Sequence, residues 1–230
     1  MSALKKFFQH NWLMIFYLNF KCLPFKQARK LPIDIYRKIR ITSLRGKILI
    51  DSTDIHRGMI KFGGQHSEMF AINPCIIDLK DGGEIVFSGC ASIGVGCYLR
   101  INDNAKFILG DHVVIGAYTK VMCYKYIEIG ERTRVSWECQ IMDSNTHYLK
   151  DIEKDVIFER DAPIILGAYN WVGNRCTIMK GVKMPNNTII ASNSLCNKDF
   201  SNIEEYSIIG GQPAKFIKSG IKRLFEGVDL

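Results

Sequence analysis

At 230 residues with a net charge of +8, the chain is long enough for one domain with a buried core and appended segments. Residues 1–50 carry eleven Lys/Arg against one Asp, so the other 180 residues have a net charge of −2, which argues against a nucleic-acid groove along the main body. The eight cysteines show no CxxC pair and no zinc-finger spacing with histidine, so we expect small core residues in a reducing cytosol.

The first 40 residues are basic and aromatic. Residues 7–20 are uncharged, but fourteen residues are too few to span a bilayer comfortably, and no small-x-small cleavage site follows as in a signal peptide. We expect residues 1–40 to form a helical appendage. Two compatible roles remain open: packing over the first coil of the repeat that follows, or peripheral contact with an anionic membrane through Trp12, Tyr17 and the phenylalanines.

A six-residue repeat is the strongest pattern in the chain. An aliphatic or sulfur-containing residue returns at every sixth position, with a two-residue slip before Ile129 and a longer break after Ile141. These positions are Leu109, Ile115, Val121, Ile129, Val135, Ile141, Leu166, Val172, Ile178, Met184, Ile190 and Cys196. The next residue is often Gly, Pro or Ala, which suits a corner, and the residue four positions on is mostly small or β-branched. Short strands wound into stacked coils satisfy this pattern, so the sequence predicts a parallel β-helix.

Two less regular stretches adjoin the clean repeats. Residues 41–83 are glycine-rich with short alternating segments, and we expect irregular opening coils there. We expect the slips of the repeat near Phe107 and near Ile127, just before Ile129, to be local bulges, which are common next to functional sites.

Residues 143–163 break the repeat altogether. A loop of this length inside a strict stack is usually functional, and insertions in solenoids project from one edge and commonly form a binding face. The insertion opens with Asp143, Asn145 and His147, three polar side chains within five residues. We therefore expect the functional site to lie where this insertion begins.

The C-terminal residues 213–230 place apolar residues at a helical period with lysines between them. We expect a capping helix there, because an open coil end exposes unpaired backbone groups. The expected organisation is thus a segment 1–40, a β-helix 41–212 that carries the insertion, and a helix 213–230.

Four landmarks follow one another in the second half of the chain: the His-bearing insertion, the residues GAYNWVGN at 167–174, the segment 189–199, and GGQPAK at 210–215. In this order they resemble the hexapeptide-repeat acyltransferases, in the branch of galactoside, maltose and polysaccharide O-acetyltransferases, over about residues 85–218. The resemblance implies an all-β solenoid, namely a left-handed parallel β-helix of triangular section. It also implies a homotrimer with acetyl-CoA bound in the cleft between neighbouring subunits.

The catalytic residues expected from this resemblance lie in the insertion. A sugar hydroxyl is a poor nucleophile, so its attack on a thioester needs a base near neutral pH, which an imidazole supplies. The resemblance implies that His147 is this base and that transfer is direct, without an acyl-enzyme. Asp143 or Asn145 would hold the imidazole in the productive tautomer.

The resemblance assigns six residues to the cofactor: Trp171, Gly173, Asn174, Ser192, Lys198 and Lys215. The tryptophan would flank the thioester, backbone amides near the next three would bind the pantetheine arm and stabilise the oxyanion, and the lysines would meet the nucleotide phosphates. Two departures stand out, since residues 191–193 read Ala-Ser-Asn where Gly-Ala-Gly is usual and Asn197 replaces a common Thr.

No metal site is expected. The other histidines, His10, His56, His66 and His112, show no metal-ligand spacing relative to His147.

The leading hypothesis is an acetyl-CoA-dependent O-acetyltransferase acting on a sugar hydroxyl of a surface polysaccharide or a lipid-linked saccharide. Its expected location is the cytoplasm, at the inner membrane face if residues 1–40 bind lipid. Three alternatives remain open: N-acylation of a nucleotide-linked amino sugar, acetylation of a xenobiotic such as an antibiotic, and a non-catalytic β-helix scaffold.

Overall fold

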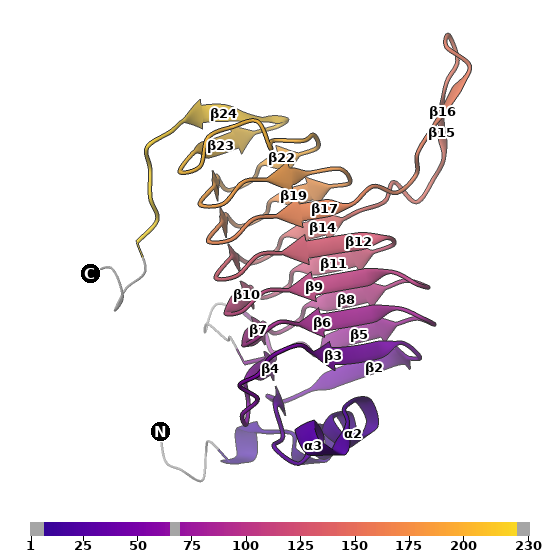
Figure 1. Ribbon diagram of the computed structural model, residues 1–230, viewed down its shortest axis with the longest axis vertical. Helices are drawn as coiled ribbons and strands as arrows, with labels where there is room; N and C mark the ends of the chain where they lie inside the picture. Colours follow the sequence, from indigo (N-terminus) through magenta and orange to yellow (C-terminus); the bar gives the residue numbers. More distant parts are fainter. Residues whose placement is uncertain (1–6, 65–69, 225–230) are drawn as a thin grey trace.

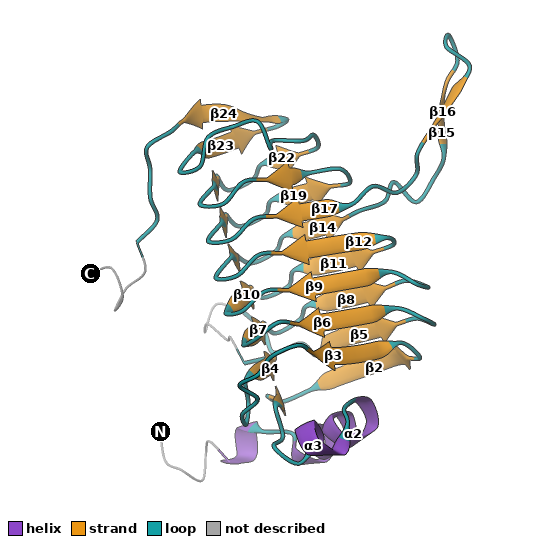
Figure 2. Ribbon diagram, in the orientation of Figure 1, coloured by secondary structure: helices purple, strands orange, loops and turns teal. Residues whose placement is uncertain are grey.

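The computed structural model describes residues 7–64 and 70–224. The chain winds through three parallel sheets that form three faces of a prism (Figures 1 and 2). The first face consists of β1 (Ile33–Ile35), β4 (Ile60–Phe62), β7 (Ala91–Ile93), β10 (Val113–Ile115), β13 (Arg134–Val135), β18 (Trp171–Val172), β21 (Ile189–Ile190), β23 (Ile208–Gly211) and β24 (Ala214–Lys218). The second face consists of β2 (Ile39–Leu44), β5 (Cys75–Leu79), β8 (Tyr98–Ile101), β11 (Lys120–Cys123), β14 (Gln140–Met142), β19 (Thr177–Met179) and β22 (Leu195–Cys196).

The third face consists of β3 (Lys47–Ile50), β6 (Glu84–Phe87), β9 (Lys106–Leu109), β12 (Tyr126–Ile129), β17 (Ile164–Leu166) and β20 (Lys183–Met184). From β1 to β14 and from β17 to β22, consecutive strands pass from face to face in a constant order, and each pairs in parallel with the strands one coil away. This arrangement is a parallel β-helix, which confirms the fold predicted from the six-residue repeat.

The repeat positions form the core. Every sixth-position residue from Leu109 to Cys196 is buried, and so are the small and β-branched residues four positions later. Stacking is in register, because Val135 pairs with Val172 and Val172 pairs with Ile190. At the corner residue Gly116, a Cβ would lie 2.5 Å from the backbone carbonyl carbon of Ser136 in the next coil, so only glycine fits. The turn-forming character of these positions is thus a consequence of close coil stacking.

The N-terminal segment caps the first coil. Helices α2 (Trp12–Cys22) and α3 (Phe25–Ala28) bury Ile15 and Leu18 against it. The buried Asn19 side chain donates to the carbonyl of Ile33 and accepts its backbone N–H, at 2.8 and 3.0 Å, which anchors α2 on β1. The coils therefore begin at residue 33, earlier than the predicted boundary at residue 41. No helix within residues 7–64 and 70–224 is long and apolar enough to cross a membrane.

The predicted C-terminal helix 213–230 is wrong over the residues described, and residues 225–230 lie outside them. The chain instead reverses at Gly211, whose φ of +104° favours glycine, and β24 pairs antiparallel with β23. The apolar residues of so short a segment also suit a strand. Pairing with the free edge of β23 satisfies backbone groups that a helix would leave exposed.

The insertion 143–163 leaves the solenoid between β14 and β17 and forms an antiparallel hairpin of β15 (Leu149–Asp151) and β16 (Val156–Phe158). The hairpin projects far from the prism (Figure 1). Neither slip is the bulge we expected, because β9, which contains Phe107, pairs with β6 and β12 in continuous register, and β12 pairs with β17 in the same way. The slip before Ile129 lies outside the strands. The extra residues lie at 124 and 125, in the turn between β11 and β12.

Candidate active site

Asp143 fixes the start of the insertion to the coil below it. Its fully buried carboxylate accepts the backbone N–H groups of Tyr124, Lys125 and Tyr126, at 2.6 to 2.8 Å. Desolvation by burial raises the pKa of Asp143, although these three N–H groups favour its ionised form. Its partners are therefore backbone amides in the widened turn and the Cys123 thiol, whose Sγ donates at 3.7 Å, whereas the sequence suggested the His147 imidazole as one.

The two ends of the insertion are joined in a short neck. The backbone N–H of Asn145 donates to the carbonyl of Arg160 at 3.0 Å, and Ser144 Oγ hydrogen-bonds Asp161. The Arg160 guanidinium donates to the Asp161 carboxylate at 2.7 to 3.1 Å, and this contact holds the pKa of Asp161 below its usual range. These contacts tie the two ends of the insertion together at the point from which the hairpin extends.

His147 lies where the neck opens, two residues beyond Asn145. The preceding residue, Thr146, has a φ of +61° and donates its N–H to Ser144 Oγ at 2.8 Å, which sets the turn. The His147 side chain is exposed, and it forms no hydrogen bond or ion pair within the part of the chain that the structure describes. The imidazole is thus presented to solvent on a positioned backbone.

Trp171 lies on the first face, in β18. Its indole N–H donates to Ser136 Oγ at 3.1 Å, and the Arg223 guanidinium lies 5.6 Å from the ring centroid. The side chain is 41% exposed, so much of the ring remains open to a ligand. Its register partner one coil below is Arg134 in β13.

Gly173, Asn174 and Ser192 meet at the corner between the first and second faces. A Cβ at Gly173 would lie 2.6 Å from the backbone nitrogen of Ser192, so the two coils are in close contact. Ser192 Oγ donates to Asn174 Oδ1 at 2.6 Å. The structure therefore brings these three expected cofactor residues together.

The two expected lysines lie on different sides of the prism. Lys198 follows β22, at the corner between the second and third faces, and its Nζ is 5.3 Å from the Phe200 ring centroid. Lys215 is exposed in β24, on the first face. Lys198 is thus on the same edge as the insertion, and Lys215 is on the same face as Trp171.

One chain does not bring the whole expected site together. The insertion with His147 leaves from the edge between the second and third faces, whereas Trp171 faces outward from the first face. Figure 1 shows the hairpin on the side away from β4, β7 and β10. Both groups nevertheless lie within one coil of each other along the axis, because the insertion follows β14 in the coil of β13 and Trp171 lies one coil above Arg134 in β13.

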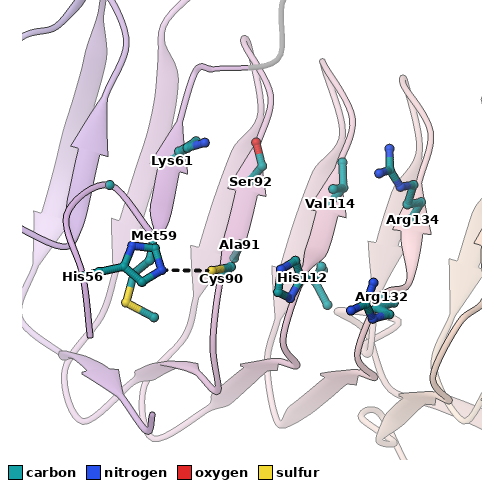
Figure 3. A pocket seen from close by; sticks show the side chains of 12 residues that line it. His56, Met59, Lys61, Cys90, Ala91, Ser92, His112, Val114, Arg132 and Arg134 are labelled. Atoms are coloured by element: carbon teal, nitrogen blue, oxygen red, sulfur yellow. Dashed lines mark hydrogen bonds between the residues drawn. The ribbon is translucent and has the colours of Figure 1, made fainter. Parts of the chain in front are cut away.

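A pocket of about 290 Å³ on the first face was missed by sequence reasoning (Figure 3). Its lining spans the four successive coils of β4, β7, β10 and β13, and it includes Lys61, His112, Arg132 and Arg134. At its side, one ligand atom each from Cys90, Asp111 and His112 lies within 4.8 Å of the others. Residues on neighbouring coils of this pocket are 20 or more positions apart in the sequence. Their proximity can therefore be predicted only once the length of each coil is known.

Comparison with known proteins gives relatives of similar length, while no family model matches. The chain is 30% identical over 188 residues to an uncharacterised 24.8 kDa protein in a cps region of Klebsiella pneumoniae, covering 81% of this chain and 82% of the relative. It is 26% identical over 153 residues to WbbJ of Escherichia coli K12, described as an O-acetyl transferase of lipopolysaccharide biosynthesis, covering 63% and 76%.

A solved structure shares the fold. The polySia-specific acetyltransferase NeuO superposes with a TM-score of 0.51 at 20% identity, covering 86% of this chain and 91% of that one.

Proposed function

Because the chain belongs to the hexapeptide-repeat acyltransferases and has their left-handed parallel β-helix, we propose that it transfers an acetyl group from acetyl-CoA to a saccharide hydroxyl. The saccharide class is supported by WbbJ, which is described as acting in lipopolysaccharide biosynthesis, and by the cps-region relative. A surface polysaccharide or its lipid-linked precursor is the acceptor we favour.

The observation that carries this proposal is the exposed imidazole of His147 where the neck opens. One ring nitrogen accepts the proton of the acceptor hydroxyl while the oxygen attacks the thioester carbonyl. The tetrahedral intermediate collapses, the C–S bond breaks, and the imidazolium returns the proton to the departing CoA sulfur. Asn145 lies beside His147 at the neck and is our candidate for orienting the ring.

The cofactor side of the proposed site is the first face with its corner. Trp171 flanks the thioester, while the backbone N–H groups of Asn174 and Ser192 bind the pantetheine arm beside Gly173. Both N–H groups lack a hydrogen-bond partner among the described residues. One such amide aimed at the thioester oxygen stabilises the developing oxyanion.

We further propose that two chains of a homotrimer build each site. With the coil axes parallel, a neighbour's His147 reaches the height of Trp171 on the adjacent first face. Lys198 would then come from the subunit that supplies His147, and Lys215 from the subunit that supplies Trp171. The phosphates of acetyl-CoA in the cleft would meet both lysines.

The projecting hairpin supports assembly, because an isolated two-stranded hairpin is marginally stable in water. Its large apolar side chains are exposed in the single chain: Tyr148, Leu149, Ile152, Val156, Ile157 and Phe158. A neighbouring subunit would cover them.

The surface of the N-terminal cap leads us to propose where the protein acts in the cell. Its outer surface exposes Leu13, Phe16, Tyr17, Phe20 and Phe25, flanked by basic residues such as Lys21 and Lys26. Aromatic groups between lysines suit the headgroup region of an anionic bilayer. Peripheral attachment at the cytoplasmic membrane face would place the enzyme beside lipid-linked saccharides.

The test is His147→Ala, with release of CoA thiol measured from acetyl-CoA and saccharide acceptors. We expect turnover to fall about 10²- to 10⁴-fold, the usual contribution of a positioned general base, with the oligomer intact by light scattering. The control Lys154→Ala changes an exposed side chain in the same insertion and should leave turnover unchanged. Undiminished turnover in the His147 variant would overturn the assignment, and acetylation of chloramphenicol alone would favour the antibiotic alternative.

A further inference from the structure

The pocket on the first face is lined by unusually many cationic groups. Lys61, His112, Arg132 and Arg134 all line it, and Figure 3 shows them spread along neighbouring coils of the first face. The pocket continues the surface that carries Trp171, since β13 with Arg134 is the neighbour of β18. The nearest cationic side chain, Arg134, is therefore one strand away from Trp171, where the thioester is expected.

The strand register fixes their spacing. The outward residues Lys61, Ser92, Val114, Arg134 and Trp171 are successive partners along the first face. Neighbouring strands lie about 4.8 Å apart, so Lys61 and Arg134 are about 14 Å apart along the coil axis. A hydroxyl and an aliphatic side chain lie between the two charges, which leaves room for a sugar ring.

The positive charge in this pocket is not neutralised by the chain itself. Asp111, beside the pocket, already accepts the N–H of Cys90 and contacts Nδ1 of His112, both at 2.7 Å. Within residues 7–64 and 70–224, no carboxylate lies within 4 Å of the cationic groups of Lys61, Arg132 or Arg134. Arg100, Arg160 and Arg175, by contrast, are each paired with a carboxylate, as Arg175 is with Glu138 at 2.7 Å.

The positive charge of Arg134 also affects the pKa of a nearby arginine. The pKa of Arg223, which lies over the Trp171 ring, is lowered by desolvation and by the positive charge of Arg134. Holding unpaired cations on one face is unfavourable unless an anion joins them, and guanidinium groups bind carboxylate and phosphate oxygens by paired hydrogen bonds.

We infer that this pocket is the acceptor subsite and that it binds an anionic group of the saccharide, a carboxylate or a phosphate. The anion would contact Arg134, Arg132 and Lys61, and the hydroxyl to be acetylated would lie next to Trp171. This inference rests on the proposed function for its orientation toward Trp171. The anion-binding property itself can be measured without turnover.

The test is calorimetric binding of three probes to the full-length protein: trigalacturonate, inorganic pyrophosphate and neutral maltotriose. We expect at least one anionic probe to bind at least tenfold more tightly than maltotriose, and the stronger anion identifies carboxylate or phosphate as the natural group. Arg134→Ala should weaken the favoured anion at least tenfold. Arg134→Lys should recover part of that loss, because it keeps the charge but not the paired hydrogen bonds.

The matched control is Arg40→Ala, which removes an exposed arginine from β2 on the second face and should leave anion binding unchanged. Equal binding of all three probes, or unchanged anion binding by a folded Arg134→Ala protein, overturns the inference. Arg134-dependent anion binding without acetyl transfer would leave the subsite standing and remove the proposed reaction. Efficient acetyl transfer to maltotriose with no anion binding would remove the anionic subsite and leave the proposed reaction standing.

Discussion

At the base of the insertion, the Asp143 carboxylate accepts backbone N–H groups of the widened turn, where regular strand pairing is interrupted. The widened turn at residues 124–126 presents three N–H groups at the point where the chain leaves its regular register, and Asp143 accepts all three. Buried donors without partners are costly, so this contact stabilises the coil and fixes the first residue of the insertion. Because His147 is only four residues later, this contact also helps to position its backbone.

Asp143→Asn tests this positioning role. An amide has one acceptor oxygen and presents an NH₂ group to the backbone donors, so we expect the free energy of unfolding to fall by about 1–3 kcal/mol. The pH profile of kcat/KM should keep its shape, because the carboxylate does not contact the imidazole. Urea unfolding and a pH–rate profile measure the two effects. Unchanged stability with a displaced pH profile would instead show that Asp143 orients His147, and Asp155→Asn at the exposed hairpin is the control.

At the scale of elements, the two appendages expose apolar surface at places that the coils do not use. The hairpin β15–β16 presents Leu149 and Phe158 as opposite partners, and α2 presents Phe16 and Phe20 on its outer side. Contiguous exposed apolar surface usually marks an interaction site. The charges of the hairpin nearly cancel, with two lysines against three acidic residues in 149–158, which suits a protein neighbour better than an anionic bilayer. The cap carries the lysines that favour anionic lipid.

The double variant Leu149→Ser/Phe158→Ser removes one apolar pair of the hairpin. We expect the protein to shift from trimer toward monomer in light scattering, with its circular dichroism unchanged, because the hairpin lies outside the solenoid core. Glu153→Ser/Lys154→Ser changes the polar tip instead and should leave the trimer intact. A trimer that persists in the double variant would show that the hairpin is not the main contact.

The cap is tested by Phe16→Ser/Phe20→Ser in co-sedimentation with phosphatidylglycerol vesicles. We expect the bound fraction to fall at least fivefold, since burial of each aromatic side chain contributes about 1.5–3 kcal/mol. Phe216→Ser removes an exposed phenylalanine at the opposite end of the solenoid and serves as control. Wild-type protein that fails to sediment with these vesicles would rule out the membrane role.

At the scale of the whole molecule, coil stacking divides the chemistry between two sides of one prism. The insertion and Lys198 lie at one edge, and the other proposed cofactor residues lie on the first face and at its corner with the second face. A rigid solenoid cannot fold these sides onto each other, because each coil is held by ladder bonds to its neighbours. The division is therefore productive only if a neighbouring subunit supplies the missing half.

Subunit complementation tests this arrangement directly. His147→Ala and Trp171→Ala proteins, each inactive alone, are mixed after reversible dissociation and assayed for CoA release. With equal mixing, about a quarter of the sites should combine an intact loop with an intact face from different subunits, so activity should return to that level. If each site lies within one chain, the mixture will show only the average of its two components.

The sequence by itself determined the coil, because a six-residue rule repeated along the chain fixes which side chains face inward and where the backbone must turn. It also isolated the insertion and its histidine, since a break is visible wherever the repeat is strict. It misjudged segments that obey no repeat: the C-terminal strand β24, whose partner is the free edge of β23, and the slip before Ile129, which widens a turn.

The tertiary structure alone decided which side chains share a surface. Lys61 and Arg134 line one pocket on the first face, yet they are 73 positions apart in the chain. Asp143 contacts residues 124–126 rather than the nearby imidazole, because the buried turn presents three backbone N–H groups to its carboxylate. Such contacts depend on the length of each coil and on the direction in which an insertion leaves it, and both are set by packing between coils.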